Sequence, residues 1–165
     1  MPKTTGAKFV ADTLKGYGLS HVFFVPQMLL DTLTGMEGMG IRRVMTHGEK
    51  AAAYMADGYA RASGKPGVCM AQHVGASNLA AGLRDAYLAC SPVIALTGGP
   101  AQARYRHAYQ ELEDFTQFDH TTKFNARVVT SPACRTCCGR RFARRPPARP
   151  ARCTCSSAAT MRKTS

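Results

Sequence analysis

The sequence is short of acidic residues and has no long apolar run. Ten Asp and Glu stand against 22 Lys and Arg in 165 residues, a formal net charge of +12, and tryptophan is absent. No stretch of about 18 consecutive apolar residues occurs, so no membrane-spanning helix and no membrane partner are expected. Residues 1–19 lack the apolar centre of a secretory signal, which favours a cytoplasmic protein. The length suits a single domain.

The positive charge is concentrated in the last part of the chain. Residues 131–165 contain nine of the 22 basic residues, none of the ten acidic residues and five of the seven cysteines. Residues 1–130 are therefore nearly balanced in charge. The composition divides the chain into a body, residues 1–130, and an Arg-, Pro- and Cys-rich tail, residues 131–165.

The body alternates helical and strand patterns. Apolar stripes and an alanine-rich segment predict helices. The expected helices are 4–18, 29–36, 49–62 and 76–89, and the expected strands are 21–26, 41–47, 67–72 and 92–98. Apolar strands that are each followed by a helix are typical of a parallel sheet covered on both faces. The predicted fold class is α/β, an open three-layer α/β/α arrangement with a mostly parallel sheet.

Four strand-to-helix junctions should meet at one edge of this sheet, where such folds bind ligands. They contain Pro26–Gln27, His47–Gly48–Glu49, residues 72–75 and residues 97–100. Glycine in three of them lets the backbone approach a ligand closely. The Gly-x-Gly-x-x-Gly and Gly-x-x-x-x-Gly-Lys-Ser/Thr motifs are both absent, so these residues do not argue for a nucleotide.

Glu49 admits two interpretations from its position. It begins the alanine-rich helix, where the helix macrodipole stabilises a carboxylate by about 0.3–1 kcal/mol. It also follows the carboxyl end of a strand, beside Gly48, where a glutamate can exchange a proton with a ligand. Pattern alone does not choose between the structural and the catalytic role.

The motif that begins at Glu49 resembles a known family. It reads Glu-x-x-Ala-x-x-x-Ala-Asp-Gly-Tyr-Ala-Arg from Glu49 to Arg61, and Ala-Ser-Gly-Lys-Pro-Gly-Val follows. This stretch is similar to the N-terminal pyrimidine-binding domain of thiamine diphosphate-dependent enzymes, and above all to acetolactate synthase-like large subunits. The resemblance continues through residues 75–99 and 108–129, and it covers roughly residues 3–130.

The resemblance implies a transferase or lyase that decarboxylates or joins 2-oxo acids with thiamine diphosphate. In the family, the glutamate that matches Glu49 hydrogen-bonds the N1′ nitrogen of the aminopyrimidine ring. The exocyclic nitrogen of that ring then removes the C2 proton of the thiazolium, which acts as the electron sink. Glu49 is therefore the expected catalytic residue.

Three further residues match family positions near the cofactor. Gly75 and Asn78 match a turn that lies against the cofactor, and Gln110 matches a glutamine near the pyrimidine and the reacting carbon. Two of these have structural alternatives. Asn78 could instead cap the following helix, and Gln110 could be an ordinary polar loop residue.

The expected substrate side departs from the family pattern. Pro26, Gln27 and His73 lie there. The family usually has glycine at the position of Gln27 and often has Gly-Pro-Gly where this chain has residues 73–75. These changes put acetolactate chemistry in doubt more than pyrimidine binding.

The family's metal motif does not occur in this sequence. Complete members hold Mg²⁺ through Gly-Asp-Gly and a downstream Asn in a C-terminal domain, with oxygen ligands. Their site forms between the pyrimidine domain of one subunit and the diphosphate domain of another, as in a homodimer. These residues would thus supply half a site with no metal ligand, inactive alone, and no motif supports FAD.

The tail has three interpretations. Cys134, Cys137, Cys153 and Cys155 could bind zinc, although the usual spacing is two Cys-x-x-Cys pairs. An Arg-rich arm could bind nucleic acid or an acidic surface, which would make the body a non-catalytic scaffold. Arg, Pro, Ala and Cys in quantity are also what a GC-rich gene encodes in a shifted reading frame. We favour this last interpretation, which predicts a disordered tail and no nucleic-acid partner.

Overall fold

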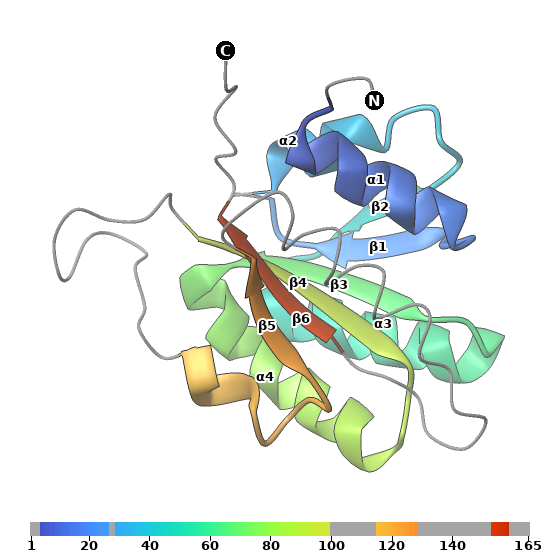
Figure 1. Cartoon of the computed structure of the whole chain (residues 1–165). Helices are drawn as coiled ribbons and strands as arrows, with labels where there is room; N and C mark the ends of the chain where they lie inside the picture. The colour runs from blue at the N-terminus through green and yellow to red at the C-terminus, as the bar shows by residue number, and fades with distance from the viewer. Residues whose placement is uncertain (1–3, 27–28, 100–114, 129–152, 159–165) are drawn as a thin grey trace, which may run out of the picture.

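A computed structural model describes residues 4–26, 29–99, 115–128 and 153–158 (Figure 1). The elements follow in chain order: α1 Gly6–Gly16, β1 His21–Phe24, α2 Leu30–Gly35, β2 Arg42–Met45, α3 Glu49–Ser63, β3 Gly67–Gln72, α4 His73–Leu88, β4 Val93–Gly99, the 3-10 helix η1 Phe115–Phe118, β5 Asn125–Val128 and β6 Cys153–Ala158. All four helices and all four strands that the body pattern predicts are present.

The six strands form one sheet in the order β2-β1-β3-β4-β6-β5, and each neighbouring pair is parallel. Helices α1 and α2 lie on one face of the sheet, and α3 and α4 lie on the other (Figure 1). The prediction of an open three-layer α/β fold is confirmed. Because β1 to β4 are parallel, their carboxyl ends meet at one edge.

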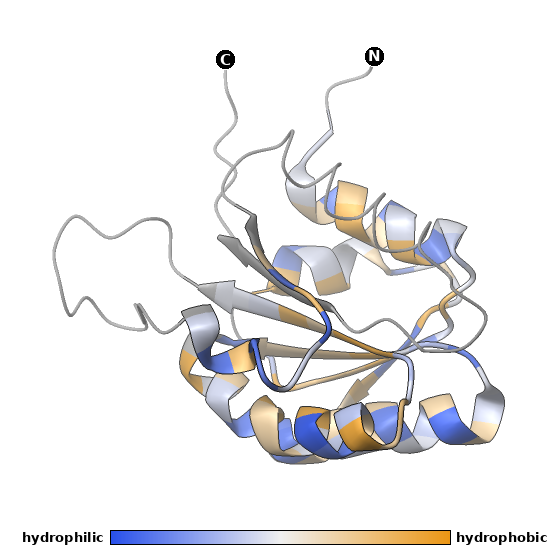
Figure 2. Cartoon of the chain, turned by 60° about the horizontal axis from the view of Figure 1, so that its bottom comes forward, coloured by the Kyte–Doolittle hydropathy of each residue, from blue (hydrophilic) through white to orange (hydrophobic). Residues whose placement is uncertain are grey.

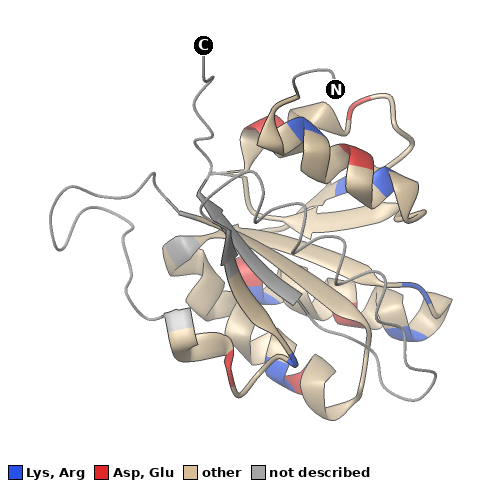
Figure 3. Ribbon diagram, in the orientation of Figure 1, with Lys and Arg blue, Asp and Glu red and all other residues tan. Residues whose placement is uncertain are grey.

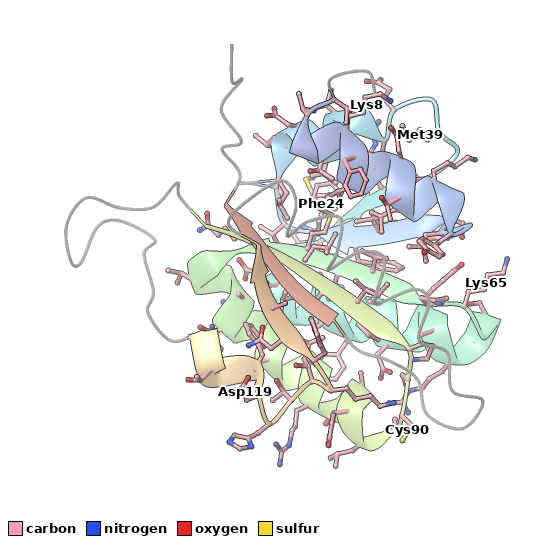
Figure 4. The ribbon with its side chains drawn as sticks, viewed as in Figure 1. Lys8, Phe24, Met39, Lys65, Cys90 and Asp119 are labelled. Carbon is pink, nitrogen blue, oxygen red and sulfur yellow. The ribbon has the colours of Figure 1, made fainter. Side chains whose placement is uncertain are left out.

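Successive residues of the central strands point into two separate cores. Val22 and Phe24 of β1 belong to the core under α1 and α2, whereas Phe23 between them belongs to the core over α3 and α4. This alternation is the period of two that a strand imposes. Phe24 is labelled in Figure 4, in the layer between β1 and α1. Both faces of the strand are thus buried, as expected in a parallel sheet.

The core over α3 and α4 is rich in small residues. Ala52, Ala53, Ala56 and Ala60 of α3 are buried against Leu79 and Leu83 of α4 and against the strands. Alanine favours the helix and adds little bulk, so α3 lies close to both the sheet and α4. Figure 2 shows that hydrophobic and hydrophilic residues alternate along each helix.

Cys69 of β3 is part of this core. The residue is fully buried, and the loss of solvation raises the pKa of its thiol to about 12. The thiol therefore stays protonated at neutral pH, and it contributes packing rather than nucleophilic chemistry.

Charged side chains are excluded from the centre of the sheet. Strands β1, β3 and β4 contain no Lys, Arg, Asp or Glu, while the helices carry most of the coloured residues in Figure 3. Arg42 and Arg43 lie exposed on β2, at the open edge of the sheet. Charges on an edge strand discourage pairing with another chain.

Asp57 and Arg61 lie one turn apart on α3 and form an ion pair of 2.6 Å. The spacing alone suggests a surface pair, but the Asp57 side chain is only 6% exposed, against 53% for Arg61. The cation thus reaches from solvent to a buried carboxylate.

Strand β6 lies within the tail, where the sequence predicts no regular structure. Residues Cys153–Ala158 pair with β4 on one side and with β5 on the other. The expectation of disorder is therefore wrong for these six residues. The strand consists of Cys, Thr, Ser and Ala, so it lacks the apolar run that marks β3 and β4. Cys134 and Cys137 lie outside the described residues, and the division of the chain at residue 130 stays a prediction.

In the part of the chain that the structure describes, no helix is long and apolar enough to cross a membrane.

The start of β3 has no room for a side chain. A Cβ on Gly67 would lie 2.7 Å from the carbonyl carbon and 3.0 Å from the Cα of Ala56 in α3. We expect Gly67→Ala to lower the free energy of unfolding by about 1–3 kcal/mol, because helix backbone would have to move. Gly58→Ala is the matched control. Its Cβ meets nothing within 4 Å, and it should raise the value by about 0.5–1 kcal/mol. Urea denaturation measures both, and equal effects would contradict the packing described.

The contribution of β6 can be measured with one proline. Thr154→Pro removes a main-chain donor from a strand paired on both sides, and it should lower the free energy of unfolding by about 1 kcal/mol or more. Thr4→Pro makes the same change at an exposed residue before α1 and should have little effect. If urea denaturation gives the parent value for both variants, β6 does not stabilise the sheet.

Candidate functional site

Glu49 lies at the carboxyl edge of the sheet, as its sequence position predicts. After β2 ends, the buried hydroxyl of Thr46 lies 3.2 Å from the carbonyl oxygen of Phe24 and 3.0 Å from that of Gly48. These contacts join the end of β1 to the turn that precedes α3. Gly48 is the N-cap of α3 in an extended conformation, and Glu49 is the first residue of the helix, partly exposed.

Helix α4 begins earlier than the sequence suggests. The pattern predicts a turn at residues 72–75 and a helix from residue 76, whereas α4 starts at His73, directly after β3. Gly75 and Asn78 are therefore in the first two turns of the helix and not in a loop. The alternative role of Asn78 as a helix cap is wrong, since Gln72 occupies the cap position.

Three predicted site residues come together between α3 and α4. The side-chain nitrogen Nδ2 of Asn78 donates a hydrogen bond of 3.1 Å to Oε2 of Glu49. A Cβ on Gly75 would lie 2.8 Å from both Cγ and Cδ of Glu49, so the glutamate side chain rests on the backbone of α4. Glycine at this position is what allows the close approach.

Two contacts further along hold the helix pair in place. A Cβ on Gly82 would lie 2.6 Å from Cβ of Ala53. The hydroxyl of Tyr54 donates a hydrogen bond of 2.6 Å to Oδ2 of Asp85, and this bond raises the pKa of Tyr54. The sequence analysis missed Gly82. The spacing of seven residues from Gly75 could have revealed it, since it places both glycines on the same face of a helix.

The other predicted residues are only partly described. Pro26 is exposed just after β1, at the same edge as Glu49. Gln27 and Gln110 lie outside the described residues. His73 begins α4, but its side chain also lies outside the description. Their roles stay predictions.

The described residues contain no group of three His, Cys, Asp or Glu side chains that could hold a metal ion. What the site offers instead is one partly exposed carboxyl group. An ionised carboxyl group has about four acceptor positions, and Asn78 uses one of them. The others are open to a ligand group that can donate a hydrogen bond to the carboxyl group or share a proton with it.

Comparison with known proteins bears on this site. Residues 4–119 match the family model described as "Thiamine pyrophosphate enzyme, N-terminal TPP binding domain"; thiamine pyrophosphate is the same compound as thiamine diphosphate.

Several relatives are similar to a large part of the chain. An acetolactate synthase of Arthrospira platensis is 40% identical over 120 residues, which is 68% of this chain and 21% of the relative. An acetolactate synthase of Bacillus subtilis is 36% identical over 129 residues, 76% of this chain and 23% of the relative. A probable 2-ketoarginine decarboxylase of Pseudomonas aeruginosa is 39% identical over 95 residues, 56% of this chain and 17% of the relative.

The aligned part of the chain thus spans about a fifth of the length of these relatives. The family model, residues 4–119, covers strands β1 to β4, Glu49 and the α3–α4 pair. The chain belongs to the thiamine pyrophosphate enzymes, of which it carries the N-terminal TPP binding domain.

Proposed function

We propose that this domain binds the aminopyrimidine end of thiamine diphosphate and that Glu49 shares a proton with the N1′ nitrogen of that ring. One observation carries the proposal. The Glu49 carboxyl group lies at the carboxyl edge of the sheet, supported by Gly75 and hydrogen-bonded by Asn78. The match to a TPP binding domain supports the choice of ligand.

Thiamine diphosphate supplies a thiazolium ring that acts as an electron sink. The task of Glu49 is to hold a proton at its carboxyl group and exchange it with the ring nitrogen. A carboxyl group can do this because it exists in protonated and ionised forms, whereas an amide of the same shape cannot. Gly75 brings the α4 backbone against the glutamate, which limits the positions that the carboxyl group can take.

For the complete protein, we propose the chemistry of 2-oxo acids. The relatives are named as acetolactate synthases and as a probable 2-ketoarginine decarboxylase, which favours decarboxylation or carbon–carbon bond formation. The sequence contains no Gly-Asp-Gly motif, so Mg²⁺ and the diphosphate would be held by residues other than these 165. We therefore propose that these residues alone bind cofactor weakly, do not turn over, and complete their site with a partner domain.

Gly75→Ala separates folding from binding. The added methyl group would collide with the flexible end of Glu49 and not with backbone, so the free energy of unfolding should change by less than about 1 kcal/mol. Displacement of the carboxyl group should weaken thiamine diphosphate binding tenfold or more. Gly58→Ala adds the same methyl group away from the site and should leave binding unchanged. Urea denaturation and calorimetric titration provide the two readouts, and unchanged binding by Gly75→Ala would contradict the proposed position of the ligand.

The direct test is calorimetric titration of the chain with thiamine diphosphate and Mg²⁺, beside Glu49→Gln. The parent chain should bind weakly, and the variant should lose tenfold or more in affinity because its amide cannot share the proton. Glu37→Gln makes the same change at an exposed residue just after α2 and should bind like the parent chain. If Glu49→Gln binds as tightly as the parent chain, Glu49 does not contact the cofactor. If none of the three proteins gives heat, the proposal that this chain alone binds the cofactor is wrong.

A further inference from the structure

The two oxygens of Glu49 have different surroundings. Oε2 accepts the hydrogen bond from Asn78, at 3.1 Å. Oε1 lies over Gly75, where any Cβ would collide with it. Within the described part of the chain, no side-chain donor forms a hydrogen bond with Oε1. The carboxyl group is therefore held at one oxygen and available at the other.

Asn78 lies on a part of α4 that is held in place by packing. Leu79, the next residue of α4, is fully buried, and Gly82 contacts Ala53 of α3 one turn further on. Asn78 itself is exposed, yet its side chain crosses to α3. The preceding residue, Ser77, turns the other way and donates to Oε1 of Gln117 at 2.9 Å. Two neighbouring residues of α4 thus bond different partners, and only Asn78 faces Glu49.

We propose that Asn78 is a positioning residue that assigns separate roles to the two oxygens of Glu49, an inference that rests on the proposed function. The nitrogen of a primary amide donates and does not accept, so Oε2 must offer it a lone pair. A proton on the carboxyl group is then carried by Oε1. In the exchange with the ligand, the O–H bond at Oε1 breaks as an N–H bond forms at the ring nitrogen.

The ionised carboxylate left by this exchange accepts the Asn78 hydrogen bond more strongly than the neutral acid does. Asn78 thus acts through Glu49. This differs from the expectation drawn from sequence, in which Asn78 touches the cofactor itself. If Asn78 acts through Glu49, the losses of binding caused by substitutions at positions 49 and 78 should not add, whereas a direct contact with the cofactor predicts additive losses.

The pairing can be tested without any cofactor. In the NMR spectrum of the full chain, the side-chain amide signals of Asn78 should shift when the Glu49 carboxyl group is protonated by lowering the pH. In Glu49→Gln this shift should disappear, because no carboxyl group faces the amide. The same pH response in both proteins would overturn the inference, whatever the cofactor does.

A double-mutant cycle then tests the route by which Asn78 acts. Asn78→Leu keeps the approximate size and removes the donor, so it should weaken thiamine diphosphate binding roughly tenfold. The double variant Glu49→Gln with Asn78→Leu should bind no more weakly than Glu49→Gln alone. The control, Ser77→Ala, should bind like the parent chain.

The outcomes separate this inference from the proposed function. Additive losses in the cycle would mean that Asn78 contacts the cofactor directly, which contradicts a positioning role. If the parent chain binds no thiamine diphosphate, the proposed function fails for this chain, and the amide signals alone decide whether Asn78 holds Glu49.

Discussion

The close packing of α3 against α4 and β3 is the constraint on which the candidate site depends. Gly67 lets α3 lie directly over the start of β3, and Gly75 and Gly82 let α4 approach α3. Since Glu49 begins one helix and Asn78 lies on the other, their hydrogen bond exists only at this spacing. A methyl group on Gly75 would collide with the Glu49 side chain. The position of the carboxyl group therefore depends on small residues where the two helices meet.

The fold could be predicted from the sequence because its signals are local. Strands such as Gly67–Gln72 are apolar along their length, and the alanine-rich run after Glu49 favours a helix. The start of α4 was predicted three residues late, because residues 73–75 contain glycine and no capping side chain. The contact between Glu49 and Asn78 joins residues 29 positions apart, so no local pattern could report it. Family resemblance selected both residues, but it did not show that they touch.

Strand β6 forms although its sequence gives no signal for a strand. Its residues, Cys153–Ala158, have no apolar run, yet each lies in register with β4 from Ile94 to Gly99. Main-chain donors and acceptors are the same for nearly every residue, so two parallel neighbours can pair with a strand whose side chains give no signal. This is compatible with a shifted reading frame, which changes side chains and leaves the backbone unaltered.

The exposure of Glu49 limits how much its hydrogen bond with Asn78 can contribute. Glu49 is partly exposed, and the exposed apolar side chains of Met45 and Val74 belong to the ends of β2 and α4 at the same edge. In water, a hydrogen bond between an amide and a carboxylate contributes little, because water competes for both groups. Covering this edge would lower the local dielectric and strengthen the hydrogen bond between Asn78 and Glu49. The proton exchange that we propose for Glu49 would need the same exclusion of water, and whatever covers the edge of the sheet would have to supply it.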